Sequence, residues 1–221
     1  MSSRRSTVIV TLVLAALSWA SPAPALAQEA PAFDPGDSRL VPNPVASSDP
    51  GTVWTCRLAG TDVRCDGAST VTWGEAGGPD DWCSVPLLSV TGTFTRTQTR
   101  YYVYDPATGD YLERQRLIHL TSDERLTADA TSSDYVTARL RMTWKSTFQT
   151  AGDLDSRITR KQGIDTLIKR PDGGIVLLDT GQKTEDLTLA PGEDFDFRGR
   201  WDIALGDPAL EFGKVCRALA L

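Results

Sequence analysis

Residues 137–149 alternate between apolar and polar side chains. One parity is apolar apart from Ser146 and the other is entirely polar: Ala138, Leu140, Met142, Trp144 and Phe148 against Thr137, Arg139, Arg141, Thr143, Lys145, Thr147 and Gln149. Successive side chains of a strand point to opposite faces, so this period of two predicts a strand with one buried and one solvated face. We expect Trp144 to sit in the core, in the middle of that strand.

Turn sequences separate further strand-like segments. Segments 101–104 and 111–120 flank Asp105-Pro106-Ala107-Thr108-Gly109-Asp110, and segments 166–169 and 175–178 flank Pro171-Asp172-Gly173-Gly174. Early proline and late glycine are typical of β-turns. Helical periodicity is confined to short stretches at 122–128 and 214–221. Many strands joined by hairpins predict an all-β fold, an antiparallel β-barrel or β-sandwich.

The first 27 residues have the organisation of a signal peptide. Arg4 and Arg5 precede the apolar stretch 8–19, and Ala25-Leu26-Ala27 matches the small-x-small pattern of a cleavage site. The apolar stretch is shorter than the about 20 residues needed to span a bilayer, which favours cleavage over a membrane anchor. We expect a secreted, extracellular protein, and Arg4-Arg5 leaves twin-arginine export open beside general secretion.

The mature chain divides into an arm and a domain. Residues 28–51 contain five prolines and no apolar period, which predicts a disordered Pro/Ala-rich arm. Residues 52–221 have the length of a single β domain.

Net charge limits the partners that the mature chain could bind. Removing residues 1–27 takes away two of the 23 Lys and Arg residues and none of the 29 Asp and Glu residues, so the net charge changes from −6 to −8. Nucleic acids require a basic surface, so we expect no nucleic-acid partner. No apolar stretch after residue 27 is long enough to anchor the chain, so we expect no membrane contact after cleavage.

Four cysteines lie in the mature chain, and an even number in an exported protein predicts disulfides. Gly60-Thr61 reads as the turn of a tight hairpin, and counting outward places Cys56 opposite Cys65 at a close-approach pair. Cys83 and Cys216 then pair by elimination. The second bridge closes a long loop and so stabilises the fold by several kcal/mol in the chain-entropy account.

The hairpin at 105–110 predicts a candidate ligand site. If Asp105 faces Asp110, then Arg96 faces His119, Gln98 faces Leu117, Arg100 faces Gln115 and Tyr102 faces Glu113. One face would then carry the predicted ligand-binding residues Arg96, Arg100, Tyr102, Glu113 and His119. Turned into a barrel, this face suits a small polar or anionic ligand. Turned to solvent, or with Glu113 neutralising Arg100, it is structural.

No motif identifies a catalytic centre, a metal site or a cofactor. His119 is the single histidine and the cysteines are expected in disulfides, so we predict no metal and no cofactor. A Gly-x-Ser-x-Gly elbow is absent from the sequence. We therefore favour a non-enzymatic binding protein for a small molecule, a glycan or another protein. The alternative is a carboxylate-dependent hydrolase or cyclase-like isomerase with Glu113 and His119 as acid and base.

Two further features each have a functional and a structural interpretation. Thr91, Thr93, Thr95, Thr97 and Thr99 alternate on the opposite face of the same strand. An ice-like lattice would need the array to continue on neighbouring strands, where the predicted register places Leu120, Ile118 and Arg116, so ordinary strand propensity is favoured. Trp73 and Trp82 bracket an acidic glycine-rich loop that would suit a sugar, although both indoles could instead fill the core.

Several turn and strand-edge segments resemble a group of small secreted actinobacterial β-proteins. They are Cys83 followed by a threonine-rich strand, Asp105-Pro106-Ala107-Thr108-Gly109, residues 171–181 and Val215-Cys216-Arg217-Ala218-Leu219. The resemblance covers roughly residues 83–217. It implies export and a compact β fold, and it assigns no functional residue.

Overall fold

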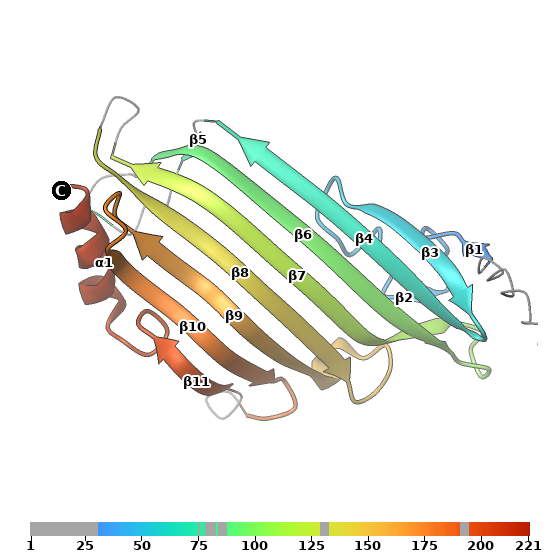
Figure 1. Cartoon of the computed structure of the whole chain (residues 1–221). Helices are drawn as coiled ribbons and strands as arrows, with labels where there is room; N and C mark the ends of the chain where they lie inside the picture. Colours follow the sequence, from blue (N-terminus) through green and yellow to red (C-terminus); the bar gives the residue numbers. More distant parts are fainter. Residues whose placement is uncertain (1–30, 75, 78–82, 84–87, 129–132, 191–194) are drawn as a thin grey trace, which may run out of the picture.

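The computed structural model describes residues 31–221 except 75, 78–82, 84–87, 129–132 and 191–194 (Figure 1). The strands are β1 (Ala32–Phe33), β2 (Leu40–Val41), β3 (Val53–Ala59), β4 (Asp62–Trp73), β5 (Ala76–Gly77), β6 (Leu88–Tyr104), β7 (Tyr111–Thr127), β8 (Tyr135–Phe148), β9 (Arg157–Lys169), β10 (Ile175–Asp186) and β11 (Phe195–Trp201). A 3-10 turn η1 (Leu154–Ser156) and a helix α1 (Pro208–Ala218) complete the described elements.

The eleven strands form one sheet. Its order is β1-β3-β4-β6-β7-β8-β9-β10-β11, with β2 beside β7 and β5 beside β6. The strand neighbours are antiparallel except β2 and β7, which run parallel. The predicted all-β antiparallel class is confirmed. The order ends at β1 and β11, so the sheet is not closed into a barrel, and the described strands form no second sheet (Figure 1).

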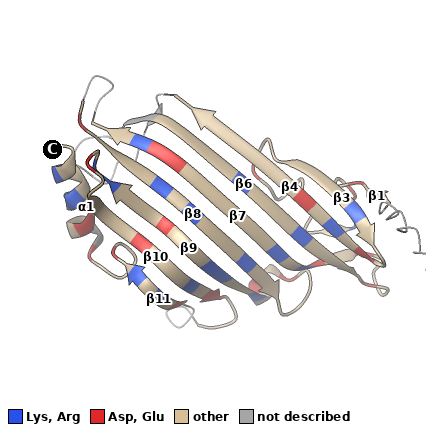
Figure 2. Cartoon of the chain, in the orientation of Figure 1, with Lys and Arg blue, Asp and Glu red and all other residues tan. Residues whose placement is uncertain are grey.

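One face of the sheet is covered at two places, and we call it the covered face. At one end α1 packs on Leu126, Val136, Ile168 and Leu177 through its own Val215. At the other end residues 31–51 lie against a second cluster that contains Leu40, Trp54 and Tyr102. Lys and Arg occur on each of the strands β6 to β9 between these two covers (Figure 2).

Two predicted helical stretches have different outcomes. Residues 122–127 continue the ladder between β7 and β8, so the helical turn predicted at 122–128 is wrong. The C-terminal helix exists but begins earlier than predicted, at Pro208, where the Asp207 carboxylate accepts the Ala209 N–H. Proline in the first turn and a capping aspartate are common helix starts. Among the described residues, no helix has the length and apolarity needed to cross a bilayer.

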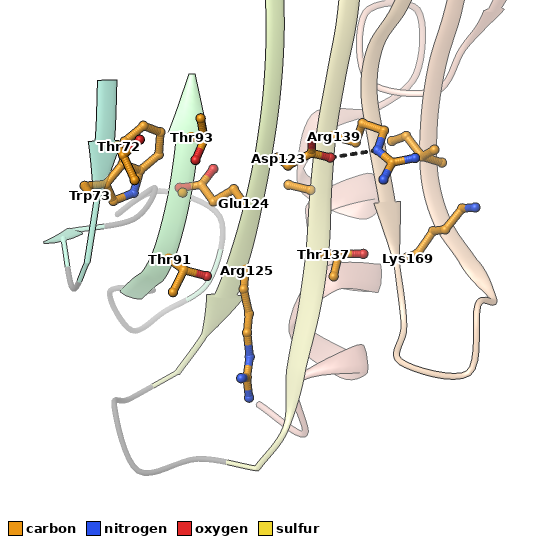
Figure 3. A pocket seen from close by; sticks show the side chains of 13 residues that line it. Thr72, Trp73, Thr91, Thr93, Asp123, Glu124, Arg125, Thr137, Arg139 and Lys169 are labelled. Atoms are coloured by element: carbon orange, nitrogen blue, oxygen red, sulfur yellow. Dashed lines mark hydrogen bonds and ion pairs between the residues drawn. The ribbon is translucent and has the colours of Figure 1, made fainter. Parts of the chain in front are cut away.

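The opposite face carries the threonines and is open, and we call it the threonine face. Thr70, Thr95 and Thr121 are in register across β4, β6 and β7, and Thr72 is in register with Thr93. A shallow hollow of about 600 Å³ lies toward one end of this face (Figure 3). Its side chains come from β4 and from the four strands β6 to β9.

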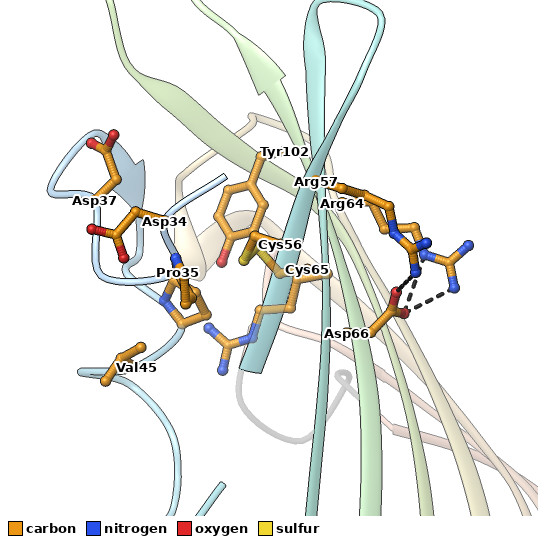
Figure 4. Close-up of a disulfide and its surroundings, with 12 residues drawn as sticks. Asp34, Pro35, Asp37, Val45, Cys56, Arg57, Arg64, Cys65, Asp66 and Tyr102 are labelled. Atoms are coloured by element: carbon orange, nitrogen blue, oxygen red, sulfur yellow. Dashed lines mark hydrogen bonds and ion pairs between the residues drawn. A yellow bond between two sulfur atoms is a disulfide. The ribbon is translucent and has the colours of Figure 1, made fainter. Parts of the chain in front are cut away.

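Both predicted disulfides are confirmed. Cys56 and Cys65 are cross-strand neighbours on β3 and β4, as counted from the Gly60-Thr61 turn (Figure 4). Cys83 is bonded to Cys216 of α1, over a separation of 133 residues. Two disulfides indicate an oxidising compartment. The predicted signal peptide, residues 1–27, lies outside the described residues.

Residues 31–51 are not the disordered arm that their prolines predict. β1 pairs with β3, and β2 pairs with β7. Leu40 is buried against Trp54, the Cys56–Cys65 bridge and Tyr102. Prolines remove backbone donors without preventing a chain from packing, and here buried Leu40, two short strand pairings and hydrogen bonds from Arg100 and Tyr102 hold the segment in place.

Candidate functional site

The β6–β7 hairpin starts in the predicted register and then leaves it. Tyr104 faces Tyr111 and Tyr102 faces Glu113, as predicted. The next pair is Tyr101 with Gln115, so Arg114 is an extra residue in β7, a β-bulge. Beyond the bulge every predicted pair is wrong by one residue. Arg100 faces Arg116, Gln98 faces Ile118, Arg96 faces Leu120 and Thr97 faces His119.

This bulge divides the five predicted ligand-binding residues between the two faces. Arg96, Arg100, Tyr102 and Glu113 lie on the covered face. His119 lies on the threonine face, where it is exposed and its Nδ1 is 3.0 Å from Thr143 Oγ1. Glu113 and His119, the acid and base of the enzyme alternative, are therefore not brought together by the fold.

Arg100, Tyr102 and Glu113 form a fully buried polar cluster instead of an open site. The Arg116 guanidinium donates to both carboxylate oxygens of Glu113, at 2.8 and 2.6 Å. Arg100 Nε lies 3.9 Å from Glu113 Oε1, so one carboxylate serves two cations. Burial and the neighbouring positive charge of Arg116 lower the pKa of Arg100. Buried ionic groups of this kind are costly unless they are paired and hydrogen-bonded.

Other donors of this cluster bind the chain's own N-terminal segment. Arg100 donates to Ser47 Oγ at 2.7 Å and to Ser48 Oγ at 3.2 Å, and it lies over the Trp54 ring at 5.0 Å. The Tyr102 hydroxyl donates to the Pro42 carbonyl at 3.0 Å. Burial, reinforced by the charge of Glu113, raises the pKa of Tyr102, so the phenol stays protonated. Residues 40–48 thus occupy the space in which a ligand was expected.

Of the five predicted residues, Arg96 lines an open pocket. The pocket lies on the covered face next to the buried cluster and has a volume of about 110 Å³. Five strands contribute its lining: Arg96 from β6, Arg116 and Ile118 from β7, Trp144 and Ser146 from β8, Arg157, Thr159 and Lys161 from β9, and Glu185 from β10. We call it the five-strand pocket.

Cross-strand register explains how these side chains converge. Arg116, Ser146, Thr159 and Glu185 are successive partners in one row across β7 to β10. Ile118, Trp144 and Lys161 form the neighbouring row. Residues opposite each other on one face are adjacent in space, so the two rows make a continuous surface. The hydroxyls of Ser146 and Thr159 meet at 2.9 Å on the floor.

Positive charge exceeds negative charge in the five-strand pocket. Four cations line it, and three of them have an acidic partner. Arg116 binds Glu113, Arg96 binds Asp49, and Lys161 binds Glu185 at 3.3 Å. Arg157 is the fourth cation, and its Nε is buried with no hydrogen-bond partner in the described part of the chain. The pocket therefore has a net charge of about +1 available to a ligand.

Three N–H donors of this pocket have no acceptor among the described residues. They are Arg96 Nε, Trp144 Nε1 and Arg157 Nε, and all three are buried. A buried donor without an acceptor costs about 1–3 kcal/mol. These three N–H groups are enclosed by their neighbours, so a ligand would contact the outer parts of the cationic side chains, and the excess of positive charge favours an anion.

Trp144 is a wall of this pocket and is half-buried, at the margin of the core rather than in its centre. The Lys161 ammonium lies 4.8 Å from its ring centroid. Trp144 packs against the buried cluster of Ile118, Leu120 and Met142, whose side chains are more completely enclosed than its own. Truncating Trp144 should therefore cost less stability than the about 3–5 kcal/mol of a core tryptophan.

Sequence reasoning missed Arg116, Arg157 and Lys161 as site residues. Arg157 and Lys161 have the same parity in β9, which is the signal that could have grouped them with Thr159. Arg116 could not be placed, because the bulge at Arg114 moves it to the covered face.

The described residues show no metal site, and the comparisons identify no family for this chain. Within the described residues, no group of three His, Cys, Asp or Glu side chains could hold a metal ion. Comparison with models of known protein families, with curated proteins and with solved structures finds no match. The five-strand pocket and the hollow on the threonine face are therefore interpreted from their own chemistry.

Proposed function

We propose that this chain is a secreted, non-enzymatic protein that binds a small organic anion in the five-strand pocket. The observation that carries the proposal is the Arg157 guanidinium, which lines the pocket and, unlike Arg96, Arg116 and Lys161, has no acidic partner among the described residues. A carboxylate, sulfate or phosphate group accepts several hydrogen bonds at once, and such charge-assisted bonds are about twice as strong as neutral ones.

The size of the pocket suits an acidic head group better than a whole metabolite. About 110 Å³ corresponds to the liquid volume of three or four water molecules. Ile118 and Trp144 give the pocket an apolar wall, so the organic part of the ligand would lie along it. Ligand sites commonly combine an apolar lining with a few polar groups that fix orientation.

Export is part of the proposal. The signal-like residues 1–27 motivate it, and the two disulfides support it, because disulfides persist in oxidising compartments. Material collected outside the producing cell should begin at Gln28 by intact mass. Material that retains residues 1–27 would contradict export by cleavage.

A thermal-shift titration tests the binding function. Wild-type protein is titrated with sulfate, phosphate, acetate, benzoate and indole-3-acetate at constant ionic strength. A bound ligand at a hundred times its dissociation constant stabilises by about 2.7 kcal/mol, which for a chain of this length raises Tm by roughly 5–10 °C. We expect one or more of the aromatic carboxylates to give such a shift.

Two variants decide whether that shift comes from the five-strand pocket. Arg157→Gln should abolish the shift, because it removes the charge that lacks an acidic partner. Arg198→Gln is the matched control, since Arg198 is exposed on β11 and outside the pocket. A shift that survives Arg157→Gln, or one that Arg198→Gln reduces equally, would contradict the proposal.

A further inference from the structure

Two cross-strand rows supply most of the polar side chains of the hollow on the threonine face, and Glu124 adds a further carboxylate. One row across the sheet is Thr91, Arg125, Thr137 and Lys169, so hydroxyl and cation alternate over β6 to β9. The next row begins Thr72, Thr93, Asp123 and Arg139. All of these side chains line the hollow, and Thr91, Thr93 and Thr137 are exposed (Figure 3).

The two rows differ in how their charges are used. The Asp123 carboxylate accepts from Arg139 Nε at 2.8 Å and also binds Arg141. Burial opposes ionisation of Asp123, but these two guanidinium groups outweigh it and lower its pKa. The negative charge of Asp123 is therefore neutralised by two neighbouring arginines.

Arg125 and Lys169 have no acidic partner in the described part of the chain. The Arg125 guanidinium lies 4.0 Å from the Tyr135 ring centroid, and its Nε is buried without an acceptor. Lys169 stands two strands away in the same row, roughly 10 Å at the usual strand spacing. The ring contact holds Arg125 in place, so one of the two cations is already positioned for a ligand.

We propose that this hollow binds an acidic polysaccharide, with uronate carboxylates on Arg125 and Lys169 and sugar hydroxyls on the threonines between them. Threonine hydroxyls both donate and accept, which complements sugar hydroxyls. Cations about 10 Å apart are matched by the repeated carboxylates of a polymer and not by a single small anion. About 600 Å³ is within the size range of ligand sites.

The hollow is independent of the five-strand pocket, because the two lie on opposite faces and share no lining residue. The mature chain is acidic overall, so general attraction to polyanions does not explain binding here. A failure to bind small anions in the five-strand pocket would therefore leave binding in the hollow untouched, and the reverse also holds.

Affinity electrophoresis of the mature, oxidised protein tests this inference. Native gels contain polygalacturonate, dextran as a neutral polysaccharide, or polyacrylate as a polyanion without hydroxyls, and mobility is compared with a gel that contains no polymer. We expect retardation by polygalacturonate, weaker retardation by polyacrylate and none by dextran. Equal retardation by polyacrylate would show that charge alone accounts for binding, which would contradict the proposed role of the sugar hydroxyls. Retardation by dextran, or none by polygalacturonate, would overturn the proposal.

Matched charge variants locate the site. Lys169→Gln and Arg125→Gln should each weaken polygalacturonate binding by at least about tenfold, because each removes a charge-assisted bond. Lys145→Gln removes the same charge from the threonine face outside the hollow and should leave binding unchanged. Far-UV circular dichroism establishes that each variant is folded, and Lys169→Gln is decisive if Arg125→Gln unfolds. Loss of binding in Lys145→Gln, or retention in Lys169→Gln, would contradict the assignment.

Discussion

Glu113 and His119 lie on opposite faces of the sheet, although they are six residues apart on one strand and would share a face in a regular strand. The extra residue Arg114 between them accounts for the difference, because one inserted residue reverses the side of every following side chain. Glu113 is buried beneath the N-terminal segment and His119 is exposed. The two residues are therefore expected to respond very differently to substitution.

Glu113→Ala should lower the free energy of unfolding by about 3–5 kcal/mol, because it leaves Arg100 and Arg116 without their shared carboxylate. His119→Ala should change it by no more than about 0.5 kcal/mol, as expected for an exposed side chain. Urea denaturation measures both. Equal effects of the two substitutions would mean that the bulge is not at Arg114.

Leu40→Ala should destabilise the protein by about 2–5 kcal/mol, because Leu40 is fully buried where the N-terminal segment meets the sheet. Val45→Ala is the control, since Val45 belongs to the same segment and is exposed. Thermal denaturation of the two variants gives the comparison. If Leu40→Ala melts like wild type, residues 31–51 do not dock.

How much the sequence predicts depends on whether a pattern is local. The Cys56–Cys65 pair follows from a two-residue turn, and the alternation of 137–149 gives both faces of β8 correctly. The register of β7 beyond Arg114 could not be predicted from the sequence, because no residue near Arg114 signals a bulge. The same one-residue error placed Leu120, Ile118 and Arg116 opposite the threonines, where the structure has Thr121, His119 and Leu117.

Long-range contacts account for the rest of what the sequence leaves open. Docking of residues 31–51 depends on a single buried leucine and on donors more than 50 positions away, such as Arg100 to Ser47. The five-strand pocket needs the register of four strand pairs at once. Neither a proline count nor a period of two contains that information.

The two disulfides should differ in their contribution to stability. In the chain-entropy account a loop of 133 residues contributes about 5 kcal/mol and a loop of 9 residues about 2.6 kcal/mol. Replacing both Cys83 and Cys216 by Ser should therefore cost more than replacing both Cys56 and Cys65. Urea midpoints of the two double variants test this order. A larger loss for the Cys56 and Cys65 variant would reverse it.

Asp202 should contribute to the acid sensitivity of the fold. The Arg200 guanidinium, against an opposing effect of burial, lowers the pKa of Asp202, and the Leu178 N–H also donates to it at 3.1 Å. A carboxyl whose folded pKa is depressed stabilises above its unfolded pKa of about 3.9, and this stability is lost as pH falls through the folded value.

Asp202→Asn should therefore lower stability at pH 7 by about 1–2 kcal/mol and flatten the loss of stability below about pH 4. Asp172→Asn is the control, because Asp172 is also an aspartate paired with an arginine, but at an exposed hairpin tip. Urea unfolding at a series of pH values from neutral to acidic measures both slopes. An acid limb as steep as that of the wild type would show that Asp202 is not linked to folding.

The crystal structure of the protein with selenate tests the central claim most directly, since selenate is a sulfate analogue whose anomalous scattering marks its position. The account predicts an anomalous peak in the five-strand pocket, within hydrogen-bond distance of the Arg157 guanidinium, and no peak there in Arg157→Gln crystals. A pocket without selenate in the wild type, or an equal peak in the variant, would contradict the account.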